Sequence, residues 1–557
     1  MSAEHRHIRT VRQWLVDGKI DRREFLRSAT LLGLSAGAAY AFANKVTGEP
    51  VISAAYAQLP KGGVIRIGMR CKEIATPHTF DWAEKSNVAR QVCEYLTKTG
   101  SDNVTRPYLL EKWEPSDDLK TWTLYLRKDV KWHNGHAFTA DDAVWNIKHV
   151  LDPATGSSVL GLMKGYMLKE VDTGQKDAQG NPKMTTELWD ANAIEKVDDH
   201  TIRLNAKVPQ LAVPEHFFHY PFLMLDPEEG GKFGPGSNGT GAFELKSHEV
   251  NQKSVLAARQ GYWGKGPQLD GIEFIDLGDD PSASANALAS RQVHGLFGGE
   301  ARLLQIYEKL DFVQRYEAVT AETAVVRGKV TEKPFNDPRV RKALRLAVDP
   351  EQVLAVTLGK LGSAGEHHHV SKVHPEYAKL PPMKRDVDAA KRLLAEAGYP
   401  NGLDLEVACG VDPEWQLISM QVMVQHWKDA GIRVKIKSMP GAQYWDVWDK
   451  VPFGYTLWYH RPLGVMIYGL AYRSGVPWNE SNYANPEFDR LLSQAEGILD
   501  VEQRRQVMAK LEQIMQEDGP IVQPLWRSVF TYYDKKVKGF RMHPTNYIFG
   551  EELAIES

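Results

Sequence analysis

One long stretch decides the fold of this chain, and it reads LLEKWEPSDDLKTWTLYLRKDVKWHNGHAFTADDAVWNIKHVLDP over Leu109–Pro153. Apolar and polar residues alternate through 122–126, and this period of two predicts a β-strand with one buried face. We expect a hairpin, with its turn near Lys128–Asp129 and a returning strand that carries the apolar residues of 130–132.

The same stretch then predicts a helix. Thr139 and Asp142 have the spacing of a capping box, in which each side chain meets a free backbone amide of the first helical turn. Val144, Ile147 and Val150 follow at helical spacing. Strand and helix therefore follow each other closely, which indicates a fold of mixed α and β elements.

Beyond Thr331 helices and strands alternate. PFNDPRVRKALRLAVDPEQVLAVTLGK predicts two helices, and DVDAAKRLLAEAGYPNG predicts one that ends at Gly398. QLISMQVMVQHWKDAGIRVKIKSM predicts a helix that ends at Gly431 and a strand from Ile432. This alternation is typical of an α/β lobe with a largely parallel sheet. The glycine-led strand GGVIRIGM, after Lys61, begins another lobe.

Composition excludes several classes of function. The chain has 557 residues, of which 43% are hydrophobic, which is enough for two or three domains. Its net charge is only −3, so no field attracts nucleic acid, and no basic run suggests a helix on a membrane surface. Fifteen tryptophans and 21 tyrosines suit a site lined by aromatic rings, although most will be core.

The three cysteines, Cys71, Cys93 and Cys409, lack the spacing of metal ligands and are too few for a disulfide framework. A single Cys71–Cys93 bridge stays open for an exported protein.

The first 57 residues have the parts of an export signal. Arg22 and Arg23 precede a short, mildly apolar run that ends at Ala43, and Ala55–Ala57 offers a small-residue cleavage site before Gln58. The string RREFLR resembles the twin-arginine export motif. A membrane anchor is the alternative, but the run is too short and too rich in glycine to span ~30 Å of hydrocarbon. We expect a soluble protein exported to the periplasm.

The segments of the chain, in their order, resemble a known family. They are GGVIRIGM, the long stretch quoted above, GTGAFEL, ARQGYWGKGPQLDGIEF, PFNDPRVRKALRLAVD and AAKRLLAEAGYPNG. Together they are similar to extracellular solute-binding protein family 5, the binding components of peptide-type ABC importers, which include dipeptide, oligopeptide and nickel binders. The resemblance covers most of Lys61–Lys538.

The resemblance implies an α/β fold, a two-lobed clamp of class II, with an extra β-rich domain inserted in the first lobe. The chain is expected to cross between the lobes near Ala324–Thr331 and Gly519–Gln523. The implied parts are a signal peptide (1–57), lobe 1 (58–100, 236–328 and 520–557), the inserted subdomain (101–235) and lobe 2 (329–519).

The implied function is to bind a small solute between the lobes and deliver it to a membrane permease with its ATPase subunits. Closure around the ligand shifts an open–closed equilibrium and needs no covalent chemistry, so we expect no enzyme activity and no cofactor. The implied protein is a monomer that binds no nucleic acid. An exported hydrolase is the alternative, but no nucleophile–base or metal motif supports it.

A metal-chelate binder of the same family is the more serious alternative. His367, His368 and His369 are adjacent in EHHHVSKVH, with His374 close behind, and imidazole suits nickel. Adjacent histidines point in different directions, however, and we expect this segment to be an exposed loop. They are therefore weak candidates for metal ligands.

The resemblance places the ligand beside the uncharged stretch that surrounds Arg461. The candidate ligand-binding residues are Tyr455, Trp458, Tyr459, His460, Arg461 and Glu73. The alternative for the aromatic residues is that they belong to the core.

Arg461 is the only charge in the 22 residues of Val451–Tyr472. Peptide-binding relatives commonly carry an aspartate in this stretch, which pairs with the α-ammonium group of the peptide. Its absence predicts that peptides with a free N-terminus bind poorly, since a buried ammonium would stay unpaired. A guanidinium here could instead hold an anionic ligand group. The alternative is that Arg461 pairs with an acidic residue and never meets the ligand.

Overall fold

The computed structural model describes residues 4–48, 59–176, 180 and 182–556. The expected cleavage site at Ala55–Ala57 lies outside these residues. No helix in the described part combines the length and apolar character that crossing a membrane requires.

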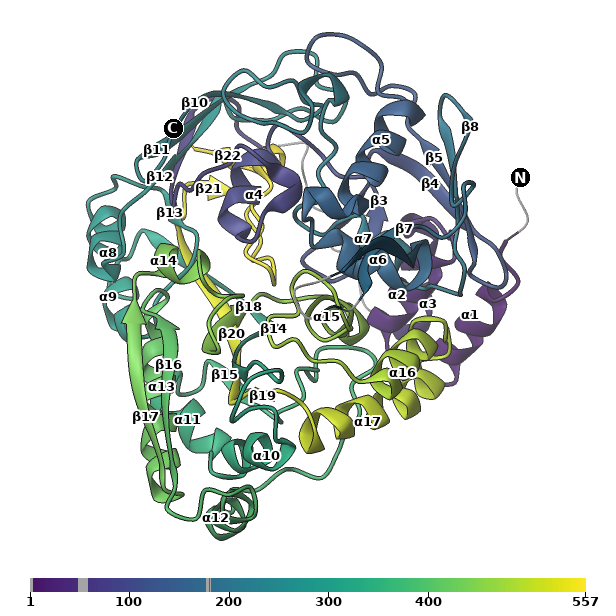
Figure 1. Cartoon of the computed structure of the whole chain (residues 1–557). Coiled ribbons are helices and arrows are strands. Elements are labelled where there is room, and N and C mark those ends of the chain that lie inside the picture. Colours follow the sequence, from purple (N-terminus) through teal and green to yellow (C-terminus); the bar gives the residue numbers. More distant parts are fainter. Residues whose placement is uncertain (1–3, 49–58, 177–179, 181, 557) are drawn as a thin grey trace.

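A twelve-stranded sheet runs through the protein (Figure 1). Its main path is β10-β11-β12-β1-β13-β20-β14-β18-β16-β17, with β15 beside β20 and β19 beside β14. The strands are β1 (Val64–Gly68), β10 (Phe243–Glu249), β11 (Lys253–Ala258), β12 (Gly271–Ile275), β13 (Gly295–Leu296), β14 (Val313–Gly328), β15 (Gly362–Ala364), β16 (Leu403–Gly410), β17 (Ile432–Met439), β18 (Phe453–Trp458), β19 (Ile521–Val522) and β20 (Leu525–Asp534).

Each half of this sheet has a parallel group of strands. In one half β1 is parallel to β12 and β13, and in the other β16 is parallel to β17 and β18. The long strand β14 joins the halves, since it pairs with β20 up to Glu322 and with β18 from Thr323 onwards. The expected lobe crossings lie close to this change of partner, while the domain boundaries stay a prediction.

The helices expected after Thr331 are confirmed. They are α10 (Pro338–Leu346), α11 (Pro350–Thr357), α12 (Val387–Glu396) and α13 (Glu414–Asp429). Asp337 caps α10 by accepting from the amide of Arg339. Gly398 and Gly431 follow α12 and α13 with φ of +93° and +79°, a conformation that glycine adopts without a steric penalty.

The other helices fill the two halves and the space between them. They are α4 (Ala83–Ala89), α8 (Pro281–Ala289), α9 (Leu304–Tyr307), α14 (Gly441–Trp445), α15 (Gly464–Ala471), α16 (Pro486–Glu496), α17 (Val501–Glu517) and the short 3₁₀ turns η2 (Pro77–Thr79), η5 (Ala301–Leu303) and η6 (Gly550–Glu552).

The segment expected to be inserted has its own four-stranded sheet, in the order β4-β5-β9-β8. Its elements are β4 (Leu110–Pro115), β5 (Thr121–Leu126), α5 (Ala140–Leu151), η3 (Pro153–Thr155), α6 (Val159–Met167), β6 (Leu168–Lys176), β7 (Pro182–Leu188), β8 (Ile194–Asp198), β9 (Thr201–Asn205), α7 (Val213–His216) and η4 (Pro227–Glu229). Among the described residues, three two-stranded ladders lie outside both sheets: β6 with β7, β2 (Thr97–Thr99) with β3 (Thr105–Pro107), and β21 (Val537–Lys538) with β22 (Ala554–Ile555).

The capping box of Thr139 and Asp142 is confirmed, but the hairpin expected after β5 is wrong. β5 pairs with β4 on one edge and β9 on the other. With both edges occupied, residues 130–132 have no strand to join, and their ordered pairing reduces to one bridge between Lys131 and Ala137. Val130 and Trp132 are nevertheless buried. The apolar pattern thus predicted the burial of these residues correctly, but their pairing with β5 incorrectly.

Three helices near the N-terminus pack against the protein, on the side where Figure 1 shows α16 and α17. They are α1 (Ile8–Val16), α2 (Arg22–Leu31) and α3 (Ala36–Thr47). Buried Arg27 of α2 lies 2.9 Å from Glu24 and 3.7 Å from Glu215 of α7, and Arg504 of α17 lies 3.4 Å from Glu24. Removal of residues 1–57 as an export signal stays a prediction.

All three cysteines are buried free thiols, so Cys71 and Cys93 are not bridged.

Candidate functional site

A cavity of about 140 Å³ lies where the parallel strands of both halves of the sheet end. Its polar wall residues follow separate strands: Arg70 after β1, Asp279 after β12, Glu300 after β13, Asp412 after β16 and Tyr459 after β18. Ligands of parallel α/β sheets bind at the carboxyl ends of the strands. The topology therefore marks this cavity as the candidate binding site.

The strands that join the two halves also line the cavity with a buried ion pair. Arg527 of β20 donates to Oε1 of Glu322 of β14 at 2.7 Å, and it also donates to the carbonyl of Gly299 at 3.0 Å. Glu322 is 0% exposed, and its Oε2 has no hydrogen-bond partner among the described residues. Burial raises the pKa of Glu322, although the guanidinium of Arg527 opposes this change.

Arg70 is held by several carboxylates at once. Its Nε lies 3.1 Å from Asp276, it is also paired with Asp279, and its Nη1 lies 3.9 Å from Asp412. Asp276 in turn accepts from the amide of Cys71 at 2.8 Å. The positive charge of Arg70 is thus largely balanced by residues of the protein.

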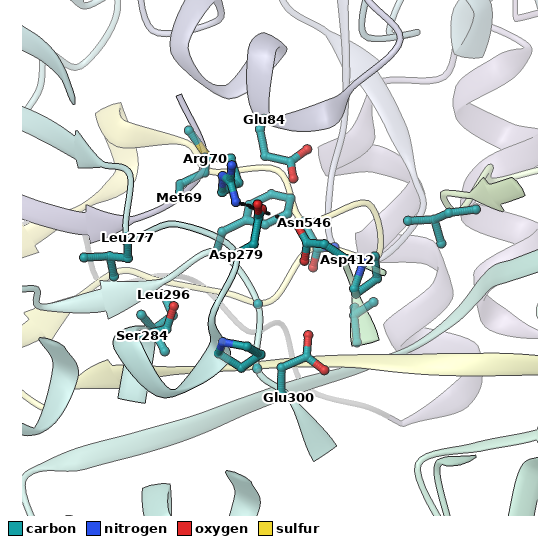
Figure 2. A pocket seen from close by; sticks show the side chains of 18 of the residues that line it. Met69, Arg70, Glu84, Leu277, Asp279, Ser284, Leu296, Glu300, Asp412 and Asn546 are labelled. Carbon is teal, nitrogen blue, oxygen red and sulfur yellow. Dashed lines mark hydrogen bonds and ion pairs between the residues drawn. The ribbon is translucent and has the colours of Figure 1, made fainter. Parts of the chain in front are cut away.

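Three other carboxyl groups face the cavity, and burial outweighs the positive charges near each of them. Figure 2 shows Glu84 on one side of the cavity and Glu300 on the opposite side, with Asp412 between them. Burial raises the pKa of Glu84 and of Glu300 to about 7, and the charge of Asp412 adds to both changes. Burial also raises the pKa of Asp412. In proteins, strongly shifted carboxyls in a cleft are candidates for a functional site.

Aromatic rings complete the wall. Trp82 and Trp445 meet edge to face, with their ring centres 5.9 Å apart. The hydroxyl of Tyr459 donates to Oε2 of Glu84 at 3.3 Å. Nζ of Lys72 lies 4.9 Å from the ring centre of Trp82, so this ring already makes one cation–π contact. Such rings give a ligand apolar contact and a favourable surface for positive charge.

Three of the residues expected at the site line a second, smaller cavity of about 10 Å³. Trp458 and Arg461 line it together with Tyr220 and Asp81, and Tyr459 lines both cavities. The indole of Trp458 donates to Oε1 of Glu480 at 3.0 Å. Of the expected residues, therefore, Tyr459 alone lines the larger cavity within the described part of the chain.

Arg461 is 4% exposed and is bound mainly by its own neighbourhood. Its Nη1 donates to the carbonyls of Tyr459 and His460 at 3.1 and 3.0 Å, and its guanidinium lies 5.2 Å from the ring centre of Tyr220. Contact between Arg461 and a ligand anion stays a prediction. The stretch around Arg461 has no acidic residue, but Glu84 and other acidic residues from separate segments line the larger cavity. Poor binding of peptides with a free N-terminus stays a prediction.

The remaining expected residues lie elsewhere. Tyr455 is fully buried and its hydroxyl bonds Ser419 at 2.8 Å. His460 is buried and accepts from the amide of Ala321 at 3.0 Å. Glu73 is exposed, and its Oε1 accepts from the two amides that follow it, each at 2.9 Å. These contacts fix local structure.

The histidine segment is buried, which corrects the expectation of an exposed loop. His367 and His369 adopt left-handed backbone conformations with φ of +60° and +63°. His367 Nδ1 accepts from the amide of Gln523 at 3.1 Å, and His369 bonds the hydroxyl of Tyr472 at 2.5 Å. His368 is fully buried. Within the described residues no three histidine, cysteine or acidic side chains lie close enough to hold a metal ion.

Sequence reasoning missed the acidic residues of the main cavity. Four of them, Asp279, Asp280, Glu300 and Asp412, follow a strand by a few positions, in the strings FIDLGDD, LFGGE and ACGVD. Glu84 lies in α4 and Glu322 within β14. An acidic residue directly after a parallel strand is the signal that could have found the first four.

The comparisons with known proteins agree with this geometry. The profile described as "Bacterial extracellular solute-binding proteins, family 5 Middle" matches residues 105–473. The chain belongs to this family. The resemblance seen in the sequence is therefore confirmed.

One relative is the periplasmic oligopeptide-binding protein OppA of Haemophilus influenzae, which is 27% identical over 86% of this chain and 91% of its own length. Two solved structures share the fold at 20% identity. DppA of Helicobacter pylori, in complex with the peptide STSA, has a TM-score of 0.77 and covers 90% of this chain and 100% of its own. AgaA of A. tumefaciens R10, in complex with agropinic acid, has a TM-score of 0.78 and covers 89% and 99%.

These likenesses confirm the α/β two-lobed clamp of class II. The main cavity lies between the two groups of parallel strands, where such a clamp closes.

Proposed function

We propose that this family 5 protein is the solute-binding component of a peptide-type ABC importer. It binds a small solute between its two lobes and delivers it to a permease driven by ATPase subunits. The observation that carries this proposal is the cavity built from both halves of the sheet. Only a ligand in that position contacts both lobes at once, so its binding energy shifts the open–closed equilibrium towards the closed form.

The protein itself acts without catalysis, as a monomer, and outside the inner membrane in the periplasm. Residues 1–57 serve as the export signal. The named function of relatives supports these points, since OppA of Haemophilus influenzae is a periplasmic binding protein. N-terminal sequencing of exported protein is expected to begin near Gln58, and recovery of full-length protein fixed in a membrane would contradict the export signal.

The function is tested by uptake and by closure. Deleting the gene is expected to abolish uptake of one class of solute, and ligand is expected to change the intrinsic tryptophan fluorescence of the purified protein without being consumed. Trp82 and Trp445 line the cavity, so lobe closure alters their surroundings. Turnover of a peptide or ester by the purified protein would contradict the proposal and favour a hydrolase.

A further inference from the structure

The N-terminal helices meet two parts of the clamp at once, α7 on one side and α17 on the other. We propose that residues 4–48 form a latch, which docks on α7 and α17 together and holds the clamp closed until the segment is removed. The latch rests on the proposed function, because it presumes a clamp that opens and an export segment that is cut off. It adds a regulation of solute binding by the chain's own N-terminus.

The helices α7 and α17 are fixed to different parts of the protein. Thr97 of β2 donates to the carbonyl of Pro214 in α7 at 2.7 Å, and both lie in the segments expected to form lobe 1 and its inserted subdomain. Arg345 of α10 donates to the carbonyl of Glu517 in α17 at 3.0 Å, and both lie in the segment expected to form lobe 2. A helix that binds both α7 and α17 therefore bridges the two lobes.

A row of four buried charges crosses this junction, where Figure 1 shows α2 between α7 and α17. Within α2, Nε of Arg27 donates to Oε2 of Glu24 at 2.9 Å. Nη1 of Arg27 lies 3.7 Å from Glu215 of α7. Nη2 of Arg504 in α17 lies 3.4 Å from Glu24. Negative and positive charges thus alternate from α7 through α2 to α17.

The two outer charges depend on α2 for their ionic partners. Glu215 is 3% exposed, and its Oε2 has no hydrogen-bond partner among the described residues. Arg504 is 0% exposed and faces Glu24. If the lobes separate, α2 can stay with only one of the two helices, so one buried charge loses its partner. Leaving a buried charge unpaired is strongly unfavourable, and the network therefore favours the closed arrangement.

Apolar residues of the segment join the same two sides. Phe25 and Leu26 of α2 are buried in one apolar cluster with Trp113 of β4 and with Val507 and Met508 of α17. Burial of apolar surface stabilises a contact in proportion to the area removed from water. This contribution is complete only while the inserted subdomain and α17 stay together around α2.

A segment that contacts both lobes acts on the clamp as a bound solute does. Its contacts are complete only in the closed form, so they shift the open–closed equilibrium towards that form. Because the segment belongs to the same chain, its effective concentration is high and no solute is needed. The full chain is therefore held closed, and removal of residues 1–57 allows the clamp to open.

The test measures the distance between the lobes in the full chain and in a protein that begins at Gln58. Spin labels are attached at Asn286→Cys of α8 and Lys437→Cys of β17, two exposed positions, while the native cysteines are buried. Both proteins are freed of bound molecules by unfolding and refolding, and no solute is added. We expect one short distance in the full chain and longer, broader distances in the shorter protein, with a ratio of closed to open molecules at least about tenfold lower. The same distribution in both proteins would overturn the latch.

A charge reversal tests the latch within the full chain. In Arg27→Glu a second carboxylate would face Glu24 and Glu215, so we expect α2 to leave the junction and the longer distances to appear. Lys45→Glu is the matched control, because it makes the same change of charge at an exposed position of α3, and it should keep the short distance. Circular dichroism checks that both variants are folded. A short distance in folded Arg27→Glu protein would overturn the latch, and if this variant does not fold, the comparison of the two chain lengths decides.

Failure of the latch is distinguishable from failure of the proposed function. Equal distances in the two chain lengths refute the latch, while uptake in the deletion strain still tests the importer. If N-terminal sequencing finds the segment retained, the export signal is refuted, and Arg27→Glu still tests whether the segment holds the lobes together.

Discussion

The guanidinium of Arg527 lies 2.7 Å from Glu322, and this buried pair joins the two strands that connect the halves of the protein. Arg527→Met would leave the negative charge of Glu322 buried and unpaired. We expect a loss of about 3–5 kcal/mol in the free energy of unfolding, measured by urea denaturation. The exposed pair of Arg433 with Asp404 is the control, and Arg433→Met is expected to cost less than about 1 kcal/mol. Equal losses in both variants would contradict a structural role for the buried pair.

The carboxyl of Glu84 predicts how stability depends on pH. Its folded pKa is raised from 4.5 to about 7, chiefly by burial, with Asp412 raising it further and Tyr459 and Lys72 lowering it. Because the folded pKa lies above the ordinary value, the contribution of Glu84 to folding stability is complete below about pH 4.5 and is lost as the pH rises through about 7.

In the ligand-free wild-type protein, we therefore expect Glu84 to lower the free energy of unfolding by on the order of 3 kcal/mol between pH 4.5 and pH 8. Glu84→Gln should abolish this decrease. Chemical denaturation at several pH values measures the slope of the free energy of unfolding against pH. Glu406→Gln, with its half-exposed side chain, should keep the wild-type slope. The same slope in Glu84→Gln would show that Glu84 does not titrate in this range.

The N-terminal helices predict a difference between the full chain and a protein that begins at Gln58. Trp113 donates to the carbonyl of Leu31 at 2.9 Å, and Glu24 pairs with Arg504. Without the segment these groups lose their partners, and apolar surface beneath α2 is exposed. We expect the shorter protein to unfold several degrees lower and to bind a hydrophobic dye more strongly, both measured by thermal scanning. Identical melting temperatures would show that the segment packs without contributing stability.

Local sequence signals predicted local structure well. The cap at Asp337 and the glycines Gly398 and Gly431 fixed where helices begin and end, because each meets a backbone requirement within a few residues. The returning strand at 130–132 was wrong for the opposite reason. Its partner depended on β9, which lies about 70 residues further along the chain and occupies the edge of β5.

The candidate site was only partly predictable. Tyr459 lines the cavity as expected, but most of the charged wall is built from residues that follow four other strands, such as Glu300 and Asp412. These residues meet only because β14 and β20 join the two halves, which is information that no single segment holds. The histidine segment misled for a similar reason, since its polarity suggested exposure while tertiary contacts with Gln523 and Tyr472 bury it.

Arg461 gives the last prediction. In the structure its donors meet two backbone carbonyls and its guanidinium lies against Tyr220, at a smaller cavity beside the main one. We expect Arg461→Met to destabilise the protein by about 1–3 kcal/mol, because carbonyl groups lose charged donors, while the affinity for the solute that the protein binds changes by less than about threefold. Urea denaturation and calorimetry measure the two effects separately. Lys435→Met, on an exposed position of β17, serves as the control for both. A loss of ligand affinity of tenfold or more with unchanged stability would instead place a ligand anion at Arg461.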